Sequence, residues 1–90
     1  NTATVKVERI HILNTESPTK AFCDILFMDS FLIKGLRVIE GKEGLFVSMP
    51  RAQARDGKWY DTAHPMTKEM RQALQDIVLE SYMEKVNEEE

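Results

Sequence analysis

Extended runs of β-branched and apolar residues, separated by turn-forming residues, occupy the first sixty positions, and this pattern is typical of β-strands. In the first such run the alternation changes parity, because Val5 and Val7 would share one face whereas Ile10 and Ile12 would share the other. A β-bulge near residues 8–9 would bring all four side chains to one face, and the alternative is that the first residues fray. Extended runs are expected at Thr4–Leu13, Lys20–Met28, Phe31–Ile39 and Leu45–Met49, with a short edge strand at Lys58–Asp61.

Turn-forming residues separate these runs. The segment Asn14–Pro18 has a turn composition, and the two residues Asp29–Ser30 suit a tight antiparallel hairpin. Gly41–Gly44 forms the next turn, and Pro50 stops the fourth run because it has no N–H to donate. The hydrophilic segment 51–57 is expected to be a mobile loop.

A C-terminal helix is indicated by apolar residues at three- and four-residue steps after Thr67, which can cap it. The stripe expected to face the sheet is Met70, Ala73, Leu74, Ile77, Val78, Ser81 and Tyr82. The opposite side carries Glu69, Gln72, Asp76, Glu80 and Glu84. Residues 87–90 contain no apolar side chain, so we expect them to fray into solvent.

The order of elements predicts an α+β fold, in which an antiparallel sheet of four to five strands packs against a C-terminal amphipathic helix. Ninety residues suit one domain, 1–90, with residues 1–3 and 87–90 frayed. A chain of this length buries only about 60–65% of the surface that its unfolded form exposes. Apolar residues occupy both faces of the run 31–39, so the sheet is expected to pack on both sides for part of its area. We therefore predict a homodimer that covers exposed edges and surface.

Composition favours a protein of the cytoplasm. No apolar stretch approaches the roughly 20 residues needed to span a bilayer, and no continuous apolar segment of a signal peptide is present. We expect no membrane insertion. The single cysteine, Cys23, lies in an apolar run and is interpreted as a small core residue in a reducing compartment.

Charge is unevenly distributed along the chain. The net charge is −3, yet residues 51–71 contain five basic and three acidic side chains, whereas residues 76–90 contain one and six. A polyanion responds to the local field within a Debye length of about 8–10 Å, so the net negative charge does not exclude nucleic-acid binding by the middle of the chain.

Candidate chemical groups do not assemble into a catalytic or metal site. His11 and His64 have no cysteine neighbour and no carboxylate arrangement suited to zinc. We interpret His64 as forming a buried or capping hydrogen bond that positions the helix start. Asp56 and Asp61 lack a third orienting group for acid–base chemistry, and Asp56 with its following glycine is typical of a turn. We expect no enzymatic activity, no metal and no cofactor.

Trp59 and Tyr60 admit two interpretations. Beside Arg55 and Lys58 they would form a stacking platform for unpaired bases. Alternatively, one ring packs under the helix and the other covers the sheet edge.

Three segments carry a family resemblance. Arg37–Gly41 reads Arg-Val-Ile-Glu-Gly, Gly44–Pro50 reads Gly-Leu-Phe-Val-Ser-Met-Pro, and Asp56–Pro65 reads Asp-Gly-Lys-Trp-Tyr-Asp-Thr-Ala-His-Pro. Together they resemble the signature of the stage V sporulation protein G family, and the match runs from about residue 14 to residue 82.

The resemblance implies a homodimer built on an antiparallel sheet with C-terminal helices. It further implies binding of DNA, and of RNA in some members, with roles in septation, sporulation timing or gene control. Family members usually carry adjacent basic residues two and three places after the Met-Pro proline. Here those places hold Ala52 and Gln53, and Arg51 and Arg55 bracket the gap.

The leading hypothesis is therefore a non-enzymatic, homodimeric regulator of septation, sporulation or gene expression that binds DNA or RNA. The candidate contact residues are Arg51, Arg55, Lys58, Lys68 and Arg71, with Arg55 first. The alternative is a protein-interaction module of the division or sporulation machinery, in which the sheet edge or the acidic tail binds a protein partner.

Overall fold

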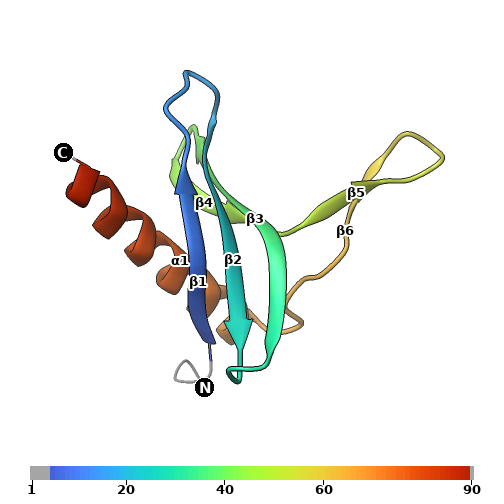
Figure 1. Ribbon diagram of the computed structural model, residues 1–90. Helices are drawn as coiled ribbons and strands as arrows, with labels where there is room; N and C mark the ends of the chain where they lie inside the picture. Colours follow the sequence, from blue (N-terminus) through green and yellow to red (C-terminus); the bar gives the residue numbers. More distant parts are fainter. Residues whose placement is uncertain (1–4, 90) are drawn as a thin grey trace.

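A computed structural model describes residues 5–89 and has an α+β architecture (Figure 1). Its elements are β1 Val5–Ile12, β2 Thr19–Phe27, β3 Phe31–Gly41, β4 Gly44–Ser48, β5 Arg51–Gln53, β6 Trp59–Asp61 and α1 Lys68–Glu89. Strands β1 to β4 form an antiparallel sheet in the order β1-β2-β3-β4, and β5 pairs with β6 in a separate two-stranded sheet. The predicted fold class, an antiparallel sheet with a C-terminal helix, is confirmed.

The predicted bulge in β1 is present. Val7 pairs with Ile25 and Arg9 pairs with Asp24, so Glu8 is the additional residue on β1. A bulge shifts the alternation by one position, and it therefore turns both apolar pairs of β1 toward the same face of the sheet.

The β2–β3 hairpin has an unusual turn. The Ser30 N–H donates to the Phe27 carbonyl at 2.9 Å, and the two residues between them, Met28 and Asp29, both have positive φ, at 50° and 55°. Positive φ at both central positions is the pattern of a type I′ turn, which Asn, Asp and Gly adopt most readily. Met28 therefore occupies a backbone conformation that disfavours its side chain.

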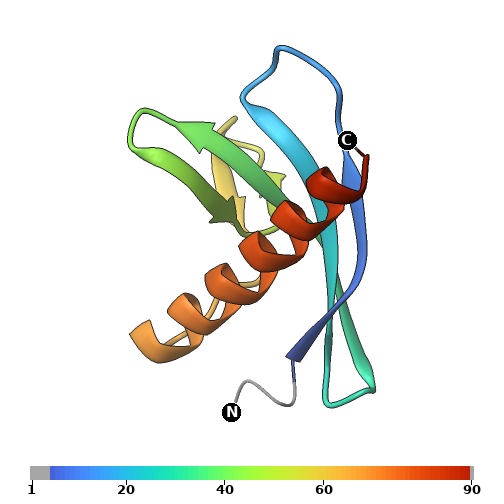
Figure 2. The same ribbon diagram turned by 90° about the vertical axis from the view of Figure 1, so that its left-hand side faces the viewer.

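The helix begins as predicted. The Thr67 hydroxyl accepts a hydrogen bond from the Met70 N–H at 3.1 Å, which is the geometry of an N-cap. Figure 2 shows α1 crossing one face of the four-stranded sheet. Leu74 and Val78 are buried against that face, whereas Asp76 and Glu80 are exposed. The predicted inner and outer sides of the helix are confirmed.

The core lies between the sheet and α1. Its buried residues are Val5, Ala21, Cys23, Ile25, Leu36, Val38, Val47, Met49, Leu74 and Val78. Cys23 is among them, as the sequence indicated, and burial raises the pKa of its thiol to about 12.

The helix extends beyond the last residues of its apolar pattern. α1 continues to Glu89, because backbone hydrogen bonds extend a helix without apolar contacts. Fraying of residues 87–89 in solution stays a prediction, while residues 1–3 and 90 lie outside the described residues.

One face of the sheet is open. The run 31–39 led us to expect packing on both faces, but within residues 5–89 α1 covers one face only (Figure 2). The face of β1–β4 opposite α1 is hereafter called the outer face.

Candidate nucleic-acid interface

The segment after Pro50 is a β-hairpin. Arg51 pairs with Asp61, Ala52 with Tyr60 and Gln53 with Trp59, and the ribbon projects on the side of the sheet away from α1 (Figure 1, Figure 2). The expected loop at 51–57 was wrong for residues 51–53, which form β5, whereas the strand expected at 58–61 is present as β6 but is not an edge strand of the main sheet. The two segments pair with each other instead of the second joining the main sheet.

A local turn explains this pairing. The Gly57 N–H donates to the Ala54 carbonyl at 3.0 Å, the Ala54 N–H donates to the Lys58 carbonyl at 2.9 Å, and Gly57 has φ +84°. Ala54 and Lys58 thus close the hairpin, and the three residues 55–57 connect them. A three-residue connection whose last residue is a left-handed glycine is common in β-hairpins. The prediction that Asp56 and Gly57 form a turn is confirmed.

The Asp56 carboxylate organises the tip of the hairpin. Its Oδ1 accepts the Lys58 N–H at 2.9 Å, and its Oδ2 accepts the Tyr60 hydroxyl at 2.7 Å. The Tyr60 hydrogen bond, followed by the backbone N–H, holds the pKa of Asp56 below its usual value of 3.8. The same bond raises the pKa of Tyr60, because ionisation would remove the donor.

The three basic residues of the hairpin differ in whether their charged groups are free to contact a ligand. Arg51 is engaged within the ribbon, since its Nε lies 3.5 Å from Asp61 Oδ1 and its Nη2 donates to the Trp59 carbonyl at 3.2 Å. Arg55 and Lys58 are exposed at the tip, and neither has an ion-pair partner within 4.0 Å among residues 5–89. The tip therefore presents two cations to solvent.

The aromatic pair is exposed. Trp59 and Tyr60 are 51% and 49% accessible, so the interpretation that one packs under the helix and the other covers the sheet edge was wrong. Consecutive strand residues point to opposite faces, so the two rings cannot form one continuous platform. Each ring instead lies on its own side of the ribbon.

The remaining candidates, Lys68 and Arg71, lie in the first turns of α1 and are exposed. Figure 1 shows that α1 begins well away from the hairpin tip. Within one chain the structure therefore gathers Arg51, Arg55 and Lys58 on the ribbon and leaves the helix pair apart.

His64 differs from its prediction. It is exposed, its Nδ1 lies 3.1 Å from the carbonyl oxygen of Pro65, and Thr67 supplies the helix cap instead. His11 is an exposed residue of β1. Within residues 5–89, no three His, Cys, Asp or Glu side chains are close enough to hold a metal ion together.

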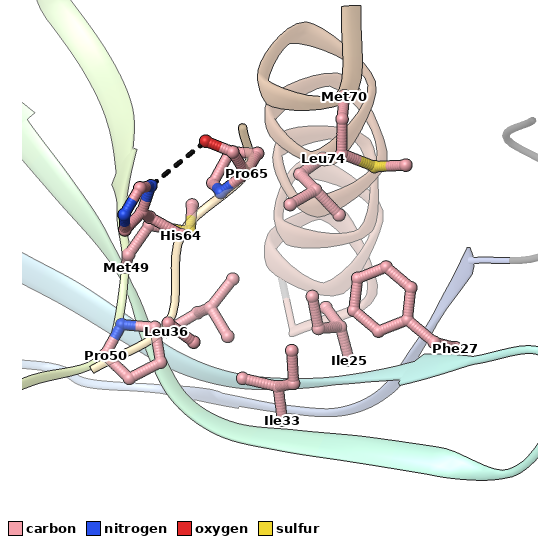
Figure 3. A pocket seen from close by; sticks show the side chains of 11 residues that line it. Ile25, Phe27, Ile33, Leu36, Met49, Pro50, His64, Pro65, Met70 and Leu74 are labelled. Carbon is pink, nitrogen blue, oxygen red and sulfur yellow. Dashed lines mark hydrogen bonds between the residues drawn. The ribbon is translucent and has the colours of Figure 1, made fainter. Parts of the chain in front are cut away.

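A cavity of about 220 Å³ lies between the sheet, the segment 63–65 and the start of α1 (Figure 3). Its walls are apolar, with Ile25, Ile33 and Leu36 contributed by the sheet and Met70 and Leu74 by the helix. It has no arrangement of polar groups that would orient a substrate. None of the helices found in residues 5–89 has the length and apolar character needed to cross a membrane.

The fold and hairpin together define a small α+β protein that presents a basic β-ribbon. The profile of the SpoVG family matches residues 2–84 of this chain. The protein called "Putative septation protein SpoVG" in Staphylococcus saprophyticus is 45% identical over 76 residues, which cover 84% of this chain and 75% of the relative. The protein of the same name in Archaeoglobus fulgidus is 40% identical over 76 residues, covering 84% of this chain and 89% of the relative. The chain belongs to the SpoVG family.

Proposed function

We propose that this protein is a non-enzymatic regulator of septation, sporulation or gene expression that binds nucleic acid as a homodimer. The septation role rests on the names of the relatives. Nucleic-acid binding rests on one observation, the projecting β5–β6 ribbon with Arg55 and Lys58 at its tip, two cations that have no ion-pair partner among residues 5–89.

The two-stranded β5–β6 ribbon is a type of element that the DNA major groove accommodates. The DNA major groove is about 12 Å wide and admits a two-stranded β-ribbon, with cations contacting the flanking phosphates. The hairpin carries three cations and two carboxylates, and one cation is held by Asp61, so its binding energy is concentrated at the tip. Lys68 and Arg71, near the positive end of the helix dipole, supply a second anion contact. In a dimer these contacts come from two chains.

The dimer itself is supported by exposed apolar groups. Phe31 and Met66 are largely exposed, and the apolar cavity opens between sheet and helix. Burial against a second copy would remove this surface from water. Light scattering at micromolar concentration is expected to give twice the mass of one chain, and a monomeric mass would contradict this part of the proposal.

The nucleic-acid proposal is tested by fluorescence anisotropy on a labelled duplex at increasing salt. Each phosphate contact releases condensed counterions, so about 4–6 contacts per dimer give a log–log slope of about −4 to −5. Arg55→Gln removes roughly one contact per chain and flattens the slope. Lys42→Gln is the matched control, because it removes an exposed charge at the β3–β4 turn. An affinity that is independent of salt, or equal effects of the two variants, would refute the proposal.

A protein-interaction module is the second candidate. It is favoured by the acidic outer side of α1, where Asp76, Glu80, Glu84 and Glu88 recur every four residues and are exposed. Such a stripe repels phosphates and suits a cationic protein partner. A pull-down that retains a protein partner after nuclease treatment, together with no duplex binding, would favour this candidate.

A further inference from the structure

The outer face presents aromatic and cationic side chains together. Cross-strand pairing places His11, Phe22, Arg37 and Ser48 in one row across β1 to β4, and Ile39 pairs with Phe46 beside that row. Phe22 and Phe46 are 41% and 43% accessible. Two phenyl rings on an open sheet are costly to leave in water, so they indicate a surface that a ligand covers.

Both rings are held in place. The Arg37 guanidinium lies over the Phe22 ring, with its central carbon 5.7 Å from the ring centroid. The Phe46 ring lies close against the backbone of Gly41, where an added Cβ would be only 3.0 Å from the ring. An aromatic ring and a guanidinium layered on a ring are both planar surfaces on which a base stacks.

The charge of this face suits phosphates. Arg9 and Arg37 lie on it, and Lys6 is paired at 2.7 Å with Asp29 of the β2–β3 turn. Asp24, the cross-strand partner of Arg9, is a carboxylate of this face, and it accepts the Gly35 N–H at 3.2 Å. Lys6, Arg9 and Arg37 therefore exceed the carboxylates of Asp24 and Asp29 by one charge, and the Arg37 guanidinium lies over the Phe22 ring, although the chain as a whole is acidic.

The shape of this face selects a single strand over a duplex. Four strands about 4.8 Å apart span roughly 14 Å before side chains are added, which exceeds the width of the major groove. The bases of a duplex are stacked on one another, whereas those of a single strand are free to stack on protein side chains. The β5–β6 ribbon projects on this same side of the sheet (Figure 1), so a strand held at its tip has a path onto the outer face.

We infer that the outer face is a binding site for single-stranded nucleic acid, on which bases stack against Phe46 and the Phe22–Arg37 pair. The inference rests on the proposed function for its ligand class, but it assigns a second site separate from the duplex-binding ribbon.

The test compares a labelled 12-nucleotide oligo-U, the matching oligo-dT and a 12-base-pair duplex in anisotropy titrations. Phe46→Leu and Phe22→Leu keep apolar bulk and remove the ring, and Arg37→Lys keeps the charge and removes the planar surface. Stacking accounts for about 1–3 kcal/mol per base, so each Phe→Leu change is expected to weaken single-strand binding roughly tenfold. Duplex affinity should stay within about twofold. Met83→Leu is the control, because Met83 is an exposed apolar side chain of α1, on the other side of the sheet from these rows.

The outcomes separate the two proposals. Unchanged oligonucleotide affinity in the outer-face variants, or an equal loss in Met83→Leu, overturns the inference while leaving duplex binding intact. A wild-type protein that binds neither single strands nor duplex removes the proposed function as well. A halved mass of the outer-face variants in light scattering would show that the face joins two copies, which also overturns the inference. If Phe22→Leu unfolds, Phe46→Leu and Arg37→Lys carry the test, and the oligo-U and oligo-dT arms tell RNA from DNA as the source.

Discussion

The hydroxyl of Tyr60 and the carboxylate of Asp56 are joined by a 2.7 Å hydrogen bond that spans the tip of the β5–β6 ribbon. Because the pKa of Asp56 is lowered in the folded hairpin, its ionised form stabilises the tip above the ordinary pKa near 3.8, and this contribution is lost as pH falls through the lower folded value.

Tyr60→Phe is therefore expected to raise the pH at which the hairpin tip loosens, because it removes the largest cause of the lowered Asp56 pKa. Trp59, the single tryptophan, lies in β6 and reports the transition by fluorescence. Far-UV circular dichroism is the control for global unfolding. An acid transition of Trp59 that is identical in both proteins would contradict the assigned hydrogen bond.

The packing of α1 predicts a contrast between its two sides. Leu74→Ala removes a side chain that is 3% exposed, so the free energy of unfolding is expected to fall by about 2–4 kcal/mol through lost burial and a residual cavity. Glu80→Ala, on the exposed side, should change it by less than about 0.5 kcal/mol. Urea unfolding measures both, and equal values would show that the helix face is wrongly assigned.

The β2–β3 turn offers a stabilising substitution. Met28 has φ 50°, a left-handed backbone conformation that is unfavourable for its side chain. The side chain is 69% exposed, so its burial does little to offset this cost. Met28→Asn is expected to raise the free energy of unfolding by about 0.5–1 kcal/mol, because Asn tolerates this conformation. Met28→Val should lower it, because a β-branched side chain tolerates it least. The order Asn, Met, Val in thermal melting temperature tests the turn, and any other order argues against it.

The burial of Cys23 predicts that its thiol is protected from alkylation in the folded protein. With its pKa raised to about 12 and its side chain in the core, alkylation at pH 8 is expected to proceed only as fast as the protein unfolds. Because the folded pKa lies above the ordinary value of 9.0, stability from the neutral thiol is fully present below pH 9 and is lost as pH rises toward 12. Mass spectrometry after iodoacetamide treatment measures the rate, and rapid labelling of the native protein would contradict the burial.

Periodicity was enough to predict the main body of the fold. The parity change between Val7 and Ile10 located the bulge, and the helical spacing of Leu74 and Val78 identified the inner side of α1. These features depend on burial, which leaves a repeating signal in the sequence.

The candidate interface was less accessible to such reasoning. Whether Trp59 joins the main sheet or pairs only with Gln53 depends on where the chain turns after Pro50, and alternation does not encode that direction. The outer face was missed because Phe22 lies between Ala21 and Cys23 in the run 21–27, which is apolar except for Asp24. Only the cross-strand register shows that Phe22 points away from α1.

The hairpin meets the rest of the chain at a narrow joint, where the N–H and hydroxyl of Thr62 both donate to the Pro50 carbonyl, at 2.8 and 3.2 Å. None of the residues between these two is buried in the core. Residues 51–61 are therefore exchangeable as a cassette. Residues 51–61 of different relatives can be grafted onto this scaffold, and the melting temperature of the grafted proteins is expected to stay nearly constant. Any difference in target preference among the grafted proteins would then be caused by these eleven residues.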